Sequence, residues 1–449
     1  MAEVAAGALI AEQVVATGIE TAAVVAVASP TQPLKFSLSQ LSKVASTNTS
    51  ANSLARSNHT LTSIGDKTYM FGGEGPDGKL CPTDVHIITL PIKKPTDIKH
   101  HEYPPFPLQD AETGRTLIPT PRSQHAACAR DKYLIVHGGR DTQGKPIEEE
   151  NCLWLWDTEK LVWTRLHSET QIGKAMTPRF GHSIFVDEQQ DFLVLHGGHA
   201  PSELQHKLVH DVDAPLSNPD LPTETETWLF DFTSDSWTAL PRAPAPPVAA
   251  AYVDTTLYTI SRTDSPFSVV VNYLHLLHSP TEREKPGALV WKTLSMPTNP
   301  LTPGPRPRDG GALVPLNLGH GRQYLIYMFG CDEPKPDHPE SAGFYSDIWS
   351  LQLPSHGLSA AKLKDKIRET LPGLDSGELS WAEVELVAAE QMVPEGKVHP
   401  GPRAFFGADS CLDGKGVVLW GGVNAKGERE DDGWVLSLAY GHADNDRWE

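Results

Sequence analysis

Arginine recurs at a similar place in six successive segments of this chain, five times directly after proline. Guanidinium groups bind carboxylate or phosphate through paired hydrogen bonds, so several of them on one surface would form an anion-binding site. Alternatively, each arginine pairs with an acid or a carbonyl of its own segment. Arg306 lies close to one of these positions. The candidate ligand-binding residues are Arg56, Arg122, Arg140, Arg179, Arg242, Arg308 and Arg403.

Three of these arginines are followed, three residues later, by His59, His125 and His182. Three imidazoles could bind zinc. However, equivalent positions of successive repeats diverge around a common axis, so we expect packing roles and no metal site. The sequence also lacks a Gly-x-Ser-x-Gly elbow, a Walker loop, a His-Glu-x-x-His pair and a dinucleotide fingerprint. We therefore predict no cofactor and leave catalytic residues unassigned.

Composition limits the classes of partner. The 449 residues carry a net charge of −19, and this average field repels phosphate. We expect no nucleic-acid binding and no membrane association. The five cysteines are scattered without a C-x-x-C pair, which indicates neither a disulfide framework nor a zinc knuckle. Free thiols fit a reducing compartment, so we expect a cytoplasmic protein.

Residues 1–33 are expected to form an N-terminal arm, either frayed or a short, loosely docked helix. They are rich in alanine and valine and carry Glu3, Glu12 and Glu20, with no basic residue before Lys35. An export signal needs a basic start, which is missing. The uncharged stretch Thr21–Pro33 is too short and too weakly apolar to span a bilayer.

An apolar strand followed by Gly-Gly, or by a worn version of it, occurs six times. The intact copies end at Gly73, Gly139, Gly198 and Gly422, and the worn copies end near Ser261 and Cys331. Each copy belongs to a unit with one order: an arginine start, a small-residue strand, a charged turn, the apolar strand, an aromatic strand and a strand with Trp. Short alternating strands with turns between them, and no βαβ rhythm, are typical of antiparallel sheets. The sequence predicts an all-β, six-bladed β-propeller with four-stranded antiparallel blades.

Arg-x-x-His, Gly-Gly, an aromatic strand and Trp, in this order, resemble the Kelch motif across roughly residues 34–449. The units exceed the usual repeat of about 50 residues, so this is a divergent Kelch propeller, similar in layout to fungal Kelch or galactose-oxidase-like propellers. In some Kelch adaptor proteins, the arginine at this motif position clamps acidic peptides. The resemblance therefore implies an arginine-lined binding face.

The chain resembles two enzyme-related propeller families only in part. A galactose oxidase would need a copper site with a Cys-Tyr crosslink, for which the sequence offers no identifiable equivalent. Plant Kelch specifier proteins carry an iron-binding Glu-x-x-x-Asp-x-x-x-His pattern. Glu333 and Asp337 match its first two positions, but the third is Ser341, with His338 out of register. We interpret this match as chance in an acidic, proline-rich loop.

The propeller is expected to span residues 34–449. Residues 34–42 are predicted to supply the outer strand of the last blade, which leaves no open sheet edge; the alternative closure uses Trp448. Long insertions are expected at 199–227 and 331–346 on the face with the diglycines, and at 352–380 on the opposite face. A helix is predicted within 358–370 of the last insertion.

The leading functional hypothesis is a monomeric Kelch binding scaffold. Its partner would be a protein or acidic peptide, or a small anionic metabolite, held on the arginine-lined face. The alternative is a small-molecule enzyme, specifier-like or a cyclase or isomerase of secondary metabolism, that uses the central pocket.

Overall fold

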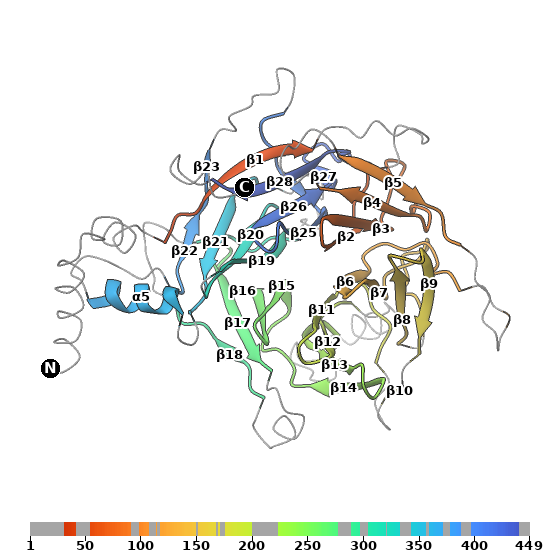
Figure 1. Cartoon of the computed structure of the whole chain (residues 1–449), viewed down its shortest axis with the longest axis horizontal. Coiled ribbons are helices and arrows are strands. Elements are labelled where there is room, and N and C mark those ends of the chain that lie inside the picture. The colour runs from red at the N-terminus through yellow and green to blue at the C-terminus, as the bar shows by residue number, and fades with distance from the viewer. Residues whose placement is uncertain are drawn as a thin grey trace, which may run out of the picture.

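The six apolar strands that precede the diglycines each form the second strand of a sheet. The computed structural model describes residues 31–41, 54–90, 98–106, 114, 117–149, 151–167, 169–170, 176–199, 223–276, 289–296, 304–319, 321–332, 343–355, 359–370, 378–387 and 397–439. Within these residues the strands form six antiparallel blades of four strands, as predicted, arranged around a ring (Figure 1). Most of the expected insertions 199–227 and 331–346 lies outside the described residues.

The blades are numbered one to six in chain order. Blades one to three are β2 (Thr60–Ile64), β3 (Lys67–Phe71), β4 (Val85–Thr89) and β5 (Lys99–Tyr103); β6 (Ala126–Arg130), β7 (Tyr133–His137), β8 (Leu153–Asp157) and β9 (Val162–Leu166); β11 (Ser183–Asp187), β12 (Phe192–His196), β13 (Thr227–Asp231) and β14 (Ser236–Leu240). Blades four to six are β15 (Pro247–Val253), β16 (Thr256–Arg262), β17 (Val269–His275) and β18 (Lys292–Thr293); β19 (Ala312–Gly319), β20 (Arg322–Met328), β21 (Ile348–Gln352) and β22 (Trp381–Glu383); β25 (Gly407–Cys411), β26 (Gly416–Trp420), β28 (Gly433–Leu438) and β1 (Lys35–Leu41).

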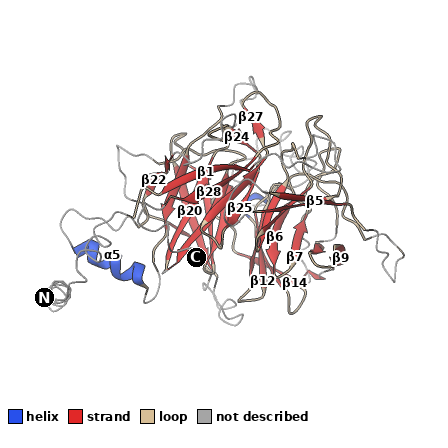
Figure 2. Ribbon diagram, turned by 45° about the horizontal axis from the view of Figure 1, so that its top comes forward, coloured by secondary structure: helices blue, strands red, loops and turns tan. Residues whose placement is uncertain are grey.

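Short elements extend this pattern. β10 (Glu169–Thr170) adds a parallel strand to β14, and β23 (Glu385–Val387) adds one to β1. β24 (Arg403–Ala404) pairs with β27 (Val423–Asn424), and η1 (Thr223–Thr225) precedes β13. The helix predicted within 358–370 is confirmed as α5 (Ala360–Thr370), which lies outside the ring beside blade five (Figures 1 and 2). Among the described residues, no helix has the length and apolarity needed to cross a membrane.

Blade six is built from both ends of the chain. β1 runs antiparallel to β28, with Phe36 opposite Leu438 and Leu41 opposite Gly433. Figure 1 shows β1 in red beside β28 in blue. Leu34, Phe36 and Leu38 alternate with polar residues, and all three are buried, since alternate side chains of a strand point to one face. Trp448, the alternative closing residue, lies outside the described residues.

The hydrophobic core lies between neighbouring blades. Trp163 on the outer strand of blade two is fully buried, and its ring lies 5.0 Å from that of Phe71 in blade one. Trp237 repeats this contact one blade later, 5.9 Å from His137. The tryptophans of these two fourth strands therefore pack against the preceding blade. Large aromatic surfaces of this kind supply much of the burial that holds a blade stack together.

The diglycine and the arginine start also join neighbouring blades through the backbone. The second glycine donates its N–H to the carbonyl of the next blade's motif arginine: Gly73 to Arg122 at 2.8 Å, Gly139 to Arg179 at 3.0 Å, and Gly422 to Arg56 at 2.9 Å. Since these contacts lie where the first strands begin and the second strands end, they define one face of the ring, which we call the diglycine face. The motif is therefore an interblade link as well as a turn.

A second row of backbone hydrogen bonds runs from blade to blade around the ring on this face. In each bond, the residue two places after a motif arginine donates its N–H to the carbonyl of the equivalent residue in the preceding blade. The bonds are Phe405 to Gly310, Asn58 to Phe405, Gln124 to Asn58 and Gly181 to Gln124, at 2.7–2.9 Å. All five residues have a positive φ. The row connects blades five, six, one, two and three. Blade four has Pro244 at this place, and proline has no N–H to donate.

Candidate functional site: the diglycine face

Five of the six motif arginines are buried beneath the diglycine face. In each, Nη1 donates to a carbonyl at the end of the second strand of its own blade, at 2.9–3.1 Å. The carbonyls accepting these bonds belong to Gly72, Gly138, Gly197, Phe329 and Gly421. The arginines Arg56, Arg122, Arg179, Arg308 and Arg403 are all exposed by 2% or less. Their guanidinium groups therefore hold the end of the second strand rather than face solvent.

In four blades the same guanidinium also binds a carboxylate. Arg122 meets both oxygens of Glu149, at 2.6 and 2.9 Å, and Arg308 meets both oxygens of Asp347, at 2.6 and 3.0 Å. Arg179 binds Glu226 at 2.7 Å. Burial alone would raise the pKa of these carboxyl groups, but the arginine hydrogen bonds and charge outweigh it and keep each pKa below its usual value. Each pair is thus an ion pair at neutral pH.

A tryptophan completes three of these clusters. The indole N–H of Trp154 donates to Glu149 at 3.0 Å, that of Trp228 to Glu226 at 3.1 Å, and that of Trp349 to Asp347 at 2.6 Å. The tryptophan belongs to the third strand, so the cluster ties that strand to the start of the first. The acid shortly before the aromatic strand therefore has a structural role in these three blades.

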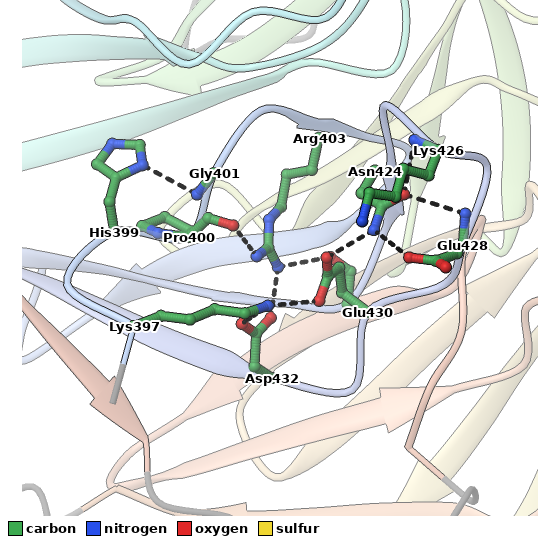
Figure 3. A network of polar contacts seen from close by, with 11 residues as sticks. Lys397, His399, Pro400, Gly401, Arg403, Asn424, Lys426, Glu428, Glu430 and Asp432 are labelled. Atoms are coloured by element: carbon green, nitrogen blue, oxygen red, sulfur yellow. Dashed lines mark hydrogen bonds and ion pairs between the residues drawn. The ribbon is translucent and has the colours of Figure 1, made fainter. Parts of the chain in front are cut away.

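Blade six shows how far such a cluster extends (Figure 3). Arg403 Nη1 binds Asp432 at 2.7 Å, and Lys397 bridges Asp432 and Glu430 at 3.2 and 2.8 Å. Asn424 donates to Glu430 at 2.9 Å. The network joins the loop before β24 to the hairpin after β26.

Blade one replaces the carboxylate–tryptophan arrangement with histidines. Arg56 Nη2 lies 2.9 Å from His86 Nε2, and His86 Nδ1 lies 3.1 Å from His100 Nε2. Because arginine can only donate, Nε2 of His86 accepts and its proton is on Nδ1. Burial, together with the charges of Arg56 and His100, lowers the pKa of His86 to about 2. His86 is therefore a neutral acceptor.

The motif histidines lie in three successive blades, each against a glycine of the preceding blade. His125 lies against Gly72 of blade one, His182 against Gly138 of blade two, and His59 against Gly421 of blade six. Burial is the main cause that lowers the pKa of each histidine. The described residues hold no group of three or more His, Cys, Asp or Glu side chains that could bind a metal. Glu333, Asp337 and Ser341 lie outside them.

Arg242 is the motif arginine that the structure leaves exposed. Its side chain is 46% exposed and binds Glu226 of blade three at 2.9 Å. In blade four, β16 continues through Ser261 and Arg262 where other blades have their diglycine. The strand thus continues at the place where the other five arginines bind a carbonyl at the strand end, and Arg242 lies at the surface.

Other partly exposed arginines lie on the same face. Arg262 binds Asp309 of blade five at 2.7 Å, and exposed Arg306 lies over the ring of Phe267 at 4.9 Å. Across the ring, Arg140 is 30% exposed and binds Glu74 at 2.7 Å. Sequence reasoning missed Arg262 and Phe267 as candidates. The worn diglycine at Ser261-Arg262 was the available signal, because loss of the turn frees the following side chains.

The seven candidate arginines thus form two groups. Arg140 and Arg242 lie at the surface of the diglycine face, while the other five lie beneath it. The assignment of all seven to ligand binding stays a prediction.

Asp409, on the inner strand of blade six, faces the inner strand of blade one and accepts the Ser63 N–H at 2.7 Å. Burial raises its pKa from the usual 3.8 to about 6, against the opposing effect of backbone N–H groups. Because the pKa of Asp409 is raised in the folded protein, its contribution to the free energy of unfolding is fully present below about pH 4 and is lost as the pH rises to about 6. Asp409→Asn should therefore be about 1–3 kcal/mol more stable than the wild type at pH 7.5 and should show no such gain at pH 4.

Urea midpoints of both proteins at pH 4, 5, 6 and 7.5 measure this effect. A constant difference between the two proteins across this range would show that Asp409 does not titrate there.

Comparisons with known proteins agree with this architecture. Residues 109–263 match the family model described as "KLHDC2/KLHL20/DRC7 Kelch-repeats domain". Host cell factor 2 of Homo sapiens is 31% identical over 134 residues, which are 28% of this chain and 16% of that protein. Dynein regulatory complex subunit 7 of Chlamydomonas reinhardtii is 28% identical over 147 residues, 32% of this chain and 11% of that protein. The matched stretches are thus small parts of these relatives.

Tip elongation aberrant protein 1 of Schizosaccharomyces pombe is 27% identical over 138 residues, 30% of this chain and 10% of that protein. The solved structure titled "Structure of YjhT" superposes with a TM-score of 0.51, covering 90% of this chain and 98% of its own, at 15% identity, which bears on the fold alone. With its recurring motif, its six blades and these matches, the chain is a Kelch-repeat β-propeller protein.

Proposed function

We propose that this propeller is a protein-binding scaffold whose diglycine face recognises an acidic peptide segment of a partner. The observation that carries the proposal is the departure of blade four from the repeat. There Arg242 and Arg262 lie partly exposed at the diglycine face, which also carries the exposed pair of Arg306 and Phe267. Cationic groups around an aromatic ring suit a segment that alternates carboxylates with apolar side chains.

The arginines of this surface already meet carboxylates at its edges, Arg242 with Glu226 and Arg262 with Asp309. Arg306 lies over the ring of Phe267, with 4.9 Å between the guanidinium carbon and the ring centroid. The five buried arginines would contribute indirectly, by fixing the loops that carry this surface. Arg140 extends the cationic surface on the far side of the ring.

The relatives support binding to proteins in general. One is by name a subunit of a dynein regulatory complex, and the Kelch resemblance implies arginine-lined recognition of acidic peptides. We also propose that the protein is cytoplasmic and monomeric, on the sequence arguments given above. The alternative of a small-molecule enzyme is not favoured, because the motif arginines of five blades and the motif histidines of three are engaged in contacts that hold the blades.

A peptide-binding experiment tests the proposed function. The probes are two fluorescein-labelled twelve-residue libraries, one with Glu or Asp at every second position and one with Gln or Asn there. We expect the acidic library to bind and the amide library to bind at least about tenfold more weakly, since charge-assisted hydrogen bonds to arginine are lost. Arg242→Ala/Arg306→Ala should weaken binding of the acidic library by roughly tenfold, and added salt should weaken it further.

Arg130→Ala is the matched control, because Arg130 is also partly exposed and ion-paired, with Asp191, but lies at the opposite face. Equal binding of the two libraries, or equal losses in the double variant and in Arg130→Ala, would contradict the proposal.

A further inference from the structure

The helix α5 is held rigidly against blade five by its buried side. Asp365 accepts two hydrogen bonds from Arg322 of β20, at 2.6 and 2.9 Å, and one from Ser355 at 2.9 Å. Arg322 also reaches the carbonyl of Ala361, at 3.4 Å. Ser359 caps the helix N-terminus by accepting the Lys362 N–H at 3.2 Å. A buried ion pair is costly to build, so this anchoring fixes which side of the helix faces outward.

The outward side of α5 combines positive charge with an exposed apolar residue. Lys362 and Lys366 are exposed, Lys364 is partly exposed, and Leu363 is 56% exposed. Asp365, the acid within residues 362–366, is buried against Arg322 and faces the blade, and Glu369 follows in the last turn of the helix. Residues 362–366 therefore present a local positive patch on a chain of net charge −19. We call Lys362, Leu363, Lys364 and Lys366 the α5 face.

Neighbouring charges strengthen this patch. Burial and then the charges of Arg322 and Arg368 lower the pKa of Lys364. A nearby anion would relieve this repulsion.

The described chain begins beside this helix. The carbonyl of Thr31 accepts a hydrogen bond from Tyr324 of β20 at 2.8 Å, and Gln32 exchanges hydrogen bonds with Ser380, both at 3.2 Å. Tyr324 is two residues from Arg322, the residue that holds α5, which corresponds to roughly 7 Å along a strand. The N-terminal segment, residues 1–30, is thus attached to the blade that carries the α5 face.

The composition of the N-terminal segment complements the α5 face. It contains Glu3, Glu12 and Glu20 and no Lys, Arg or His, and most of its other residues are alanine, valine or isoleucine. Thirty residues can span up to about 100 Å when extended and about 45 Å as a helix, so reach is no obstacle. Because the segment is tethered, its effective concentration at α5 is in the millimolar range or above, which makes weak ion pairs sufficient.

We propose that the N-terminal segment docks on the α5 face, with its glutamates beside Lys362, Lys364 and Lys366 and its apolar residues over Leu363. This is an intramolecular contact on the side of the ring away from the diglycine face, so it is independent of the proposed peptide binding.

Zero-length crosslinking of the full chain tests this contact. A carbodiimide joins a carboxyl group to a lysine amine only when they touch, with loss of water, and peptide mass spectrometry locates the bond. We expect crosslinks from Glu12 or Glu20 to the α5 lysines, lost at high salt because exposed ion pairs are screened. Crosslinks of the glutamates to lysines spread over the surface, or none at all, would overturn the proposal.

Lysine acylation provides the second measurement. In the full chain, Glu3→Gln/Glu12→Gln/Glu20→Gln should raise the acylation rate of Lys362 and Lys366 by roughly three- to tenfold, the range for a tethered contact of a few exposed ion pairs. Lys79 is the control, because its side chain is 83% exposed and lies on the diglycine face. Unchanged rates at α5, or equal changes at Lys79, would overturn the docking. Failure here would leave the peptide-library result unaffected, so the two proposals can fail separately.

Discussion

Gly138→Ala should destabilise the propeller by roughly 3–5 kcal/mol, the sum of a left-handed backbone penalty and an overpacking penalty. Gly138 has a φ of +61°, and an added Cβ would lie 2.6 Å from the Arg179 carbonyl oxygen and 2.8 Å from His182 Cε1. Both atoms belong to the next blade, and the oxygen is part of the backbone. The clash cannot be relieved by turning one side chain, because the Gly139–Arg179 hydrogen bond holds that carbonyl in place.

Gly144 is the matched control for this prediction. It lies in the hairpin that follows the same diglycine, has a φ of +75°, and has no heavy atom within 4 Å of an added Cβ. Gly144→Ala should cost only the backbone term, about 1–2 kcal/mol. Thermal and urea unfolding of both variants measure the difference. Equal losses at the two sites would show that the backbone conformation alone, and not the interblade contact, requires the glycine.

Arg122→Ala should lower the free energy of unfolding by about 3–5 kcal/mol, because it leaves the carboxylate of Glu149 buried without its cation. It also removes the donor to the Gly138 carbonyl and frees the start of the first strand. The second substitution Glu149→Gln should recover part of the lost free energy of unfolding, since the uncompensated carboxylate is then replaced by a neutral amide. A double-mutant cycle in urea unfolding measures this coupling.

Arg242→Ala provides the control at the same motif position in another blade. Its side chain is solvated and its ion pair with Glu226 is at the surface, so we expect a loss of at most about 1 kcal/mol. Similar losses for Arg122→Ala and Arg242→Ala would contradict the assignment of the buried arginines to holding the blades.

The strand pattern of this chain could be predicted from the sequence because each strand is coded locally. The apolar run Tyr133–His137, the aromatic and aliphatic residues that alternate in Leu153–Asp157, the turns and the repeat of the whole unit predicted six four-stranded blades. The alternation of Leu34, Phe36 and Leu38 with polar residues marked an extra strand at the N-terminus. Both kinds of pattern are visible without knowledge of the partner strand.

The candidate site could be predicted less well from the sequence, because the exposure of an arginine depends on atoms far away in the chain. Arg122 and Arg242 follow proline in the same way, yet one is buried and the other is at the surface. The sequence by itself determined the repeat, the number of blades and the positions of the arginines. Only the tertiary structure decided which arginines face solvent, because that depends on whether a carbonyl at the strand end and a second acceptor, a carboxylate or His86, converge on the guanidinium within its blade.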